Sequence, residues 1–173
     1  MALLLRKIRK SRWYKTESMS WLSENELPAD SLSDLGTKSN ELSVYHISLN
    51  ESNLDRVIAA LAANSGFLSN FDYAIFNEEM LSNSGIKTKK TPGDSSDEQV
   101  NNWHIDLYEL SAHKLLNLAL QIKHHASIKR LSHKQVLNFI VDALISGHIN
   151  RSNIKWESKE DQDMLDRLIA ERS

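Results

Sequence analysis

Two extended segments flanking an amphipathic helical stripe place the strongest constraint on the fold of this chain. The segment ELSVYHISL (Glu41–Leu49) has apolar residues on both faces, which is typical of a strand covered on both sides. The segment NFDYAIFN (Asn70–Asn77) has alternating Phe, Tyr and Ile and predicts a second strand. The order strand, helix, strand predicts a small βαβ-like unit over residues 41–81. The helical stripe between the strands, expected to pack against Val44 and Ile47, consists of Leu54, Val57, Ile58 and Leu61.

The C-terminal half is expected to be helical. Residues 82–99 are rich in Ser, Gly and Lys and indicate a loop that ends in a capping box at Ser95–Glu98. One long helix of about 28 residues is predicted from there to His125. A second capping box at Ser132–Gln135 begins another helix, and a short helix ends the chain.

These elements predict an α+β, mainly helical protein with a single folded domain. Its expected parts are a basic arm with an irregular segment (residues 1–40), the βαβ-like unit (41–81) and a helical region (82–173). With 173 residues, the chain is long enough to bury a substantial core.

The segment LLLRKIRKSRWYK (Leu3–Lys15) carries six positive charges and no negative one. The rest of the chain has 15 basic and 23 acidic residues, so a basic arm precedes an acidic body. The arm also holds too much apolar surface to remain in water at low cost, which favours docking over a solvated tail. We expect it to bind an acidic protein groove or a phosphate backbone through Arg6, Lys7, Arg9, Lys10, Arg12 and Trp13.

Several chemical functions are disfavoured by the sequence. The absence of cysteine removes disulfides, thiolate nucleophiles and cysteine-ligated metals, and fits a reducing cytoplasm. The turn after the first predicted strand, SLNESN, has no glycine with which to cradle a phosphate. No G-x-S-x-G motif is present. We therefore expect no catalytic residue, no metal site and no cofactor.

One polar cluster keeps an enzymatic alternative open. On the predicted long helix, Asp106, Glu109 and His113 share a face, whereas His104 and His113 lie on opposite sides. A solvated helix face with an i, i+4 pair is the simpler interpretation. A metal site at His124 and His125 would need a third ligand such as His133, and adjacent residues diverge on a helix.

No apolar run approaches the length of a membrane span, so we expect no membrane partner. The basic residues near the N-terminus follow the leucines and precede no apolar stretch, which is the wrong order for a secretory signal.

Four segments together resemble the small companion subunits of bacterial defence complexes of the Lamassu type. They are LLRKIRKSRWY, DLGTKSNELSVYHI, NLDRVIAALAA and PGDSSDEQVNNWHIDLYELSAHKLLNLA. The resemblance covers most of the chain up to about residue 147 and includes no chemical signature. It implies a non-catalytic subunit that bridges an SMC-like ATPase and an effector, often a nuclease, in defence against phages or plasmids. The alternative is a nucleic-acid-binding accessory protein that contacts DNA, weakly or indirectly, through the basic arm.

Overall fold

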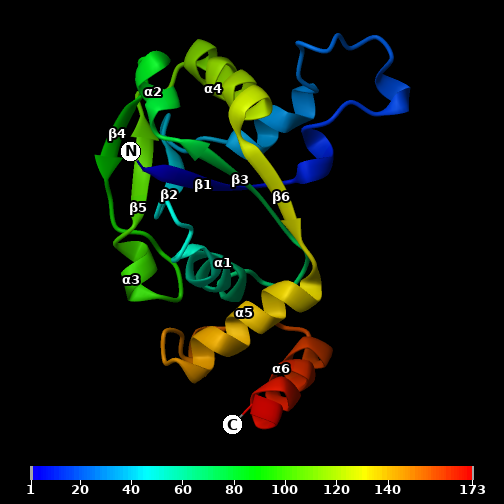
Figure 1. Cartoon of the computed structure of the whole chain (residues 1–173), viewed down its shortest axis with the longest axis vertical. Helices are drawn as coiled ribbons and strands as arrows, with labels where there is room; N and C mark the ends of the chain where they lie inside the picture. The colour runs from blue at the N-terminus through cyan, green and yellow to red at the C-terminus, as the bar shows by residue number, and fades with distance from the viewer. Residues whose placement is uncertain (1, 173) are drawn as a thin grey trace.

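The computed structural model describes residues 2–172, apart from the side chain of Asn83, and its centre is a six-stranded sheet. The strand order is β4-β5-β2-β1-β3-β6, and every neighbouring pair is antiparallel (Figure 1). The strands are β1 (Leu3–Ile8), β2 (Leu42–Ile47), β3 (Phe71–Asn77), β4 (Lys87–Lys90), β5 (His104–Tyr108) and β6 (Ser127–Leu131). The α-helices are α1 (Leu54–Ala63), α2 (Glu79–Asn83), α3 (Glu98–Asn101), α4 (Ala112–His125), α5 (His133–Ile145) and α6 (Lys159–Arg172). Short 3-10 helices are η1 (Lys10–Arg12), η2 (Glu17–Met19), η3 (Ala29–Leu35) and η4 (Arg151–Asn153).

The sheet lies between two helical layers. On one side, α1 packs against α5, and α6 covers α5 from outside; on the other side lie α4, α2 and η3 (Figure 1). Each layer closes over its own apolar cluster because successive residues of a strand point to opposite faces. In β1, Leu5 belongs to the cluster under α1 and α5, and Leu4 belongs to the cluster under α4.

The N-terminal segment forms the interior of the sheet rather than an arm. β1 lies between β2 and β3, with Leu5 opposite Tyr45 on one side and Ile75 on the other. The prediction of a docking arm before the folded body is therefore wrong. The apolar residues that suggested docking, Leu4, Ile8 and Trp13, are buried against the protein's own helices.

The predicted βαβ-like unit is also wrong in its pairing. β2 and β3 both run antiparallel to β1, which lies between them, so the two strands are parallel to each other but are not neighbours. The helical stripe does face inward, with Val57 and Ile58 in the same cluster as Ile47. Val44 belongs to the cluster on the opposite face of the sheet and does not pack there.

The predicted long helix is divided into α3, β5 and α4, which corrects the expectation of a mainly helical protein. Ile105 and Leu107 alternate inward along β5, which pairs with both β2 and β4. The chain turns at Glu109, whose φ is 55°. Asp97, rather than Ser95, caps α3 by accepting from the backbone N–H groups of Gln99 and Val100. The capping box at Ser132 and Gln135 is present as predicted and begins α5.

Candidate functional site

The guanidinium of Arg6 fastens β1 to the layer that contains α4 and η3. It donates two hydrogen bonds to the backbone carbonyl of Asp34 (3.1 and 2.9 Å) and a third to that of Ser43 (2.8 Å). Burial lowers the pKa of Arg6, and the charge of Asp34 opposes that shift. The guanidinium of Arg6, the first charged group of the basic segment, is thus bound by backbone carbonyls within the fold.

The carboxylate of Asp34 binds three groups of the segment that follows β1. One oxygen accepts from the backbone N–H of Arg9 (2.7 Å) and the indole N–H of Trp13 (2.9 Å). The other oxygen pairs with the Arg12 guanidinium at 3.2 Å. The Asp34 side chain is only 6% exposed, so these donors replace the water that a buried carboxylate loses.

The remaining predicted contact residues are also used within the molecule. Lys7 donates to the hydroxyl of Ser65 (3.3 Å), and its ammonium nitrogen lies 5.2 Å from the centre of the Phe71 ring. The backbone N–H of Lys10 donates to Asp72 (2.7 Å), and its Nζ lies 6.0 Å from the ring centre of Tyr14. Of the six predicted residues, Lys7 and Arg9 are exposed, and Arg9 joins this network through its backbone N–H.

A surface candidate follows directly in the chain, at residues 14–27, which we call the Trp21 loop. Trp21 is 73% exposed and Tyr14 is 50% exposed, the former being the most exposed of the large apolar side chains in the described chain. The loop extends away from the layered body (Figure 1, upper right, blue). A tryptophan in water is costly, and this residue type is enriched at the centres of protein interfaces.

The Trp21 loop is fastened at several points. Leu22, next to Trp21, is 4% exposed, and its carbonyl accepts from Lys15 Nζ at 2.6 Å. Lys123 of α4 donates to the carbonyls of Glu24 and Glu26, both at 2.5 Å. These contacts hold the loop in one shape while its indole faces water, which reduces the entropy lost on binding.

The sequence interpretation overlooked Trp21. Its signal was a tryptophan among Ser, Glu and Asn in a segment without periodicity, where an apolar side chain has no predicted core to enter. By contrast, the neighbouring charges led to the prediction that Trp13 contacts a partner, and Trp13 is buried.

The residues of the enzymatic alternative do not come together. Asp106 lies on β5 and accepts from Thr91 (2.7 Å) and Ser43 (3.0 Å). Glu109 lies in the following turn and pairs with Lys87 at 2.7 Å, and His113 is exposed on α4. Within residues 2–172, no group of three or more His, Cys, Asp or Glu side chains has the placement of a metal site.

Comparison with known protein families, curated proteins and solved structures finds no match to this chain. No helix among the described residues is both long and apolar enough to cross a membrane.

Proposed function

We propose that this protein is a non-catalytic interaction subunit that holds partner proteins through the Trp21 loop. The observation that carries the proposal is the 73% exposure of Trp21 on a loop fixed by Leu22 and Lys123. An exposed indole on a loop whose neighbouring residues are held by the fold offers a large contact area at little conformational cost.

The resemblance to Lamassu-type companion subunits names the expected partners. They are an SMC-like ATPase and an effector nuclease, bridged by this subunit in the cytoplasm during defence against phages or plasmids. Use of Arg6 and Arg12 inside the fold weakens the nucleic-acid alternative, because it removes two of the segment's six cations from contact with phosphates.

The test is co-expression of the full chain with an SMC-like ATPase and an effector encoded beside it, followed by affinity purification. Trp21→Ala is expected to weaken assembly about 30-fold or more, the loss typical of a central interface anchor. The matched control is Phe67→Ala, because Phe67 is 68% exposed and lies between α1 and β3. Equal assembly of wild type and Trp21→Ala would refute the proposal. Salt-sensitive DNA binding by the isolated chain, without protein partners, would support the alternative.

A further inference from the structure

On the side of the sheet covered by α1 and α5, a cleft of about 340 Å³ lies between α1, α5 and the turn before β5. This volume is at the lower end of ligand-sized pockets, which begin at roughly 300 Å³. The cleft is lined at the start of α1 by Asp55 and Arg56, at the turn by Trp103, and along α5 by Phe139 and Asp142.

The cleft has a negative charge that the chain leaves uncompensated. The Asp55 carboxylate forms no ion pair or hydrogen bond with the described residues. Partial burial raises the pKa of Asp55, and the negative charges of Asp142 and Glu51 raise it further. Glu51 is itself paired with Lys129 at 3.4 Å.

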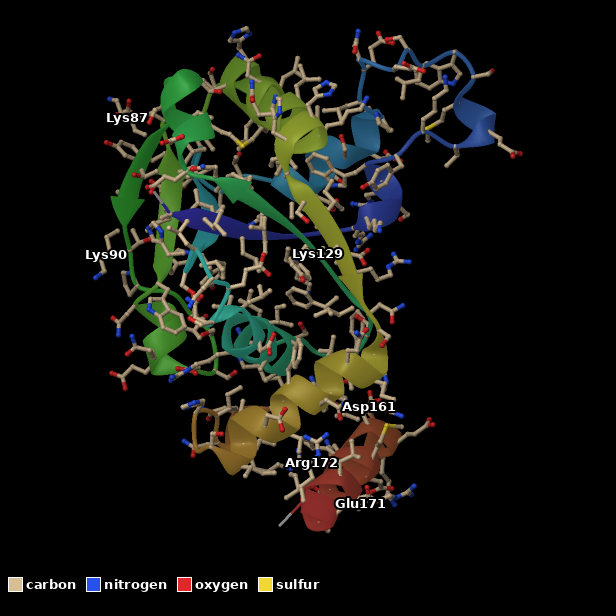
Figure 2. The ribbon with its side chains drawn as sticks, in the orientation of Figure 1. Lys87, Lys90, Lys129, Asp161, Glu171 and Arg172 are labelled. Carbon is tan, nitrogen blue, oxygen red and sulfur yellow. The ribbon has the colours of Figure 1, made fainter. Side chains whose placement is uncertain are left out.

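Arg56, the one arginine or lysine that lines the cleft, is committed to a different carboxylate. Its Nε and Nη2 donate to Asp97 at 2.5 and 2.9 Å, and the Asp97 side chain is 1% exposed. The same guanidinium lies 5.7 Å from the ring centre of Trp103. Asp142 pairs at 2.6 Å with Arg172, which approaches α5 from the end of α6 (Figure 2).

The lining therefore combines two carboxylates with two aromatic walls. A positively charged head group with an aliphatic stem satisfies both, because carboxylates attract the charge and aromatic rings contact the stem and the cation. An anion would be repelled by Asp55, whose charge has no partner among the described residues. A neutral apolar ligand would desolvate the carboxylates without replacing their hydrogen bonds.

We infer that this cleft binds an arginine or lysine side chain of a protein partner. The inference rests on the proposed function, since it assigns the basic residue to a partner, but it concerns a surface separate from the Trp21 loop. Figure 1 shows α5 at the lower end of the molecule and the loop at the upper end. The two surfaces would allow one subunit to contact two partners.

The test uses a small probe, so that its outcome is separate from that of the assembly assay. Acetyl-Gly-Arg-Gly-amide is titrated into the ¹⁵N-labelled full chain, and the indole N–H resonance of Trp103 is followed by NMR. The control peptide replaces arginine by citrulline, which keeps the shape and removes the charge. We expect saturable shifts with a dissociation constant in roughly the millimolar range for the arginine peptide alone.

The variants locate the site. Asp55→Asn and Asp142→Asn are expected to weaken binding of the arginine peptide about fivefold each, the upper range for an exposed ion pair. Asp166→Asn, which removes an exposed carboxylate of α6 paired with Arg151, is expected to leave binding unchanged. Equal shifts with the citrulline peptide, or unaltered binding by Asp55→Asn, would overturn the inference. This result would leave the assembly test of Trp21→Ala unaffected.

Discussion

At the scale of single residues, Asp34 ties the N-terminal segment to the sheet. We expect Asp34→Asn to lower the free energy of unfolding by about 2–3 kcal/mol, since it replaces charge-assisted hydrogen bonds to Arg12, Trp13 and the backbone of Arg9. Urea denaturation followed by tryptophan fluorescence measures the change. Asp30→Asn, an exposed position on the same 3-10 helix, is the control and is expected to change stability by less than about 0.5 kcal/mol. Equal effects of the two substitutions would contradict the role of Asp34.

The pair formed by Asp97 and Arg56 predicts a pH-dependent contribution to stability. Burial acts to raise the pKa of Asp97, but the Arg56 hydrogen bond and charge, with the backbone N–H groups of α3, outweigh it and lower the pKa below 3.8. A carboxyl whose pKa is lowered by folding stabilises the protein above its unfolded pKa, and that stabilisation is lost as pH falls through the folded value.

Asp97→Asn separates the ion pair from the helix cap, because asparagine is also a good cap. We expect it to cost about 1–3 kcal/mol near neutral pH, with the difference from wild type shrinking below about pH 3.8. Urea denaturation at a series of pH values measures it. A difference that stays constant down to acid pH would show that the charge of Asp97 is not the cause.

At the scale of elements, β1 is the strand on which the others depend. It pairs with both β2 and β3 near the centre of the sheet and places Leu4 and Leu5 in opposite clusters, each fully buried. We expect deletion of residues 2–8 to abolish cooperative thermal unfolding, because β2 and β3 would lose their shared partner and expose two unpaired edges. Circular dichroism measures the transition.

Deletion of α6 is the comparison for β1. This helix packs on α5 at the periphery and has one fully buried residue, Leu165. The shortened chain is expected to be less stable but still to unfold cooperatively. A folded chain without β1, or an unfolded chain without α6, would reverse this assignment of their importance.

At the scale of the whole molecule, the two apolar clusters share one sheet and are expected to unfold together. Ile58 in α1 lies in one cluster and Leu118 in α4 lies in the other, and both are at most 1% exposed. Replacing either by alanine is expected to cost about 2–5 kcal/mol. Each variant should shift the urea transitions seen by far-ultraviolet circular dichroism and by fluorescence equally. Separate transitions for the two signals would show that the layers are independent.

The sequence by itself determined the elements with strong local signals. The stripe of Val57 and Ile58 specified α1, the alternation in FDYAIFN specified β3, and the capping box at Ser132 began α5. Each depends on side chains within a few residues of one another, so the local pattern is sufficient.

The tertiary structure decided which segments became strands at the centre and the edge of the sheet. HIDLY fits helical and extended spacing alike, and no Gly or Pro lies between Gly93 and Gly147 to mark a turn. The turn at Glu109 has a positive φ at a residue that gives no such signal. Pairing with β2 and β4 made the segment a strand, because those partners satisfy its backbone hydrogen bonds.

Contacts with residues distant in sequence also decided the structure of the N-terminal segment and of the candidate site. The charges of LLLRKI suggested an arm, but Asp34 and the carbonyl of Ser43, both distant in sequence, let Arg6 enter the fold. Burial of Trp13 and exposure of Trp21 depend on the position of η3 and Lys123 in space. Composition could give the number of charges and tryptophans, whereas only long-range contacts decided which of them face water.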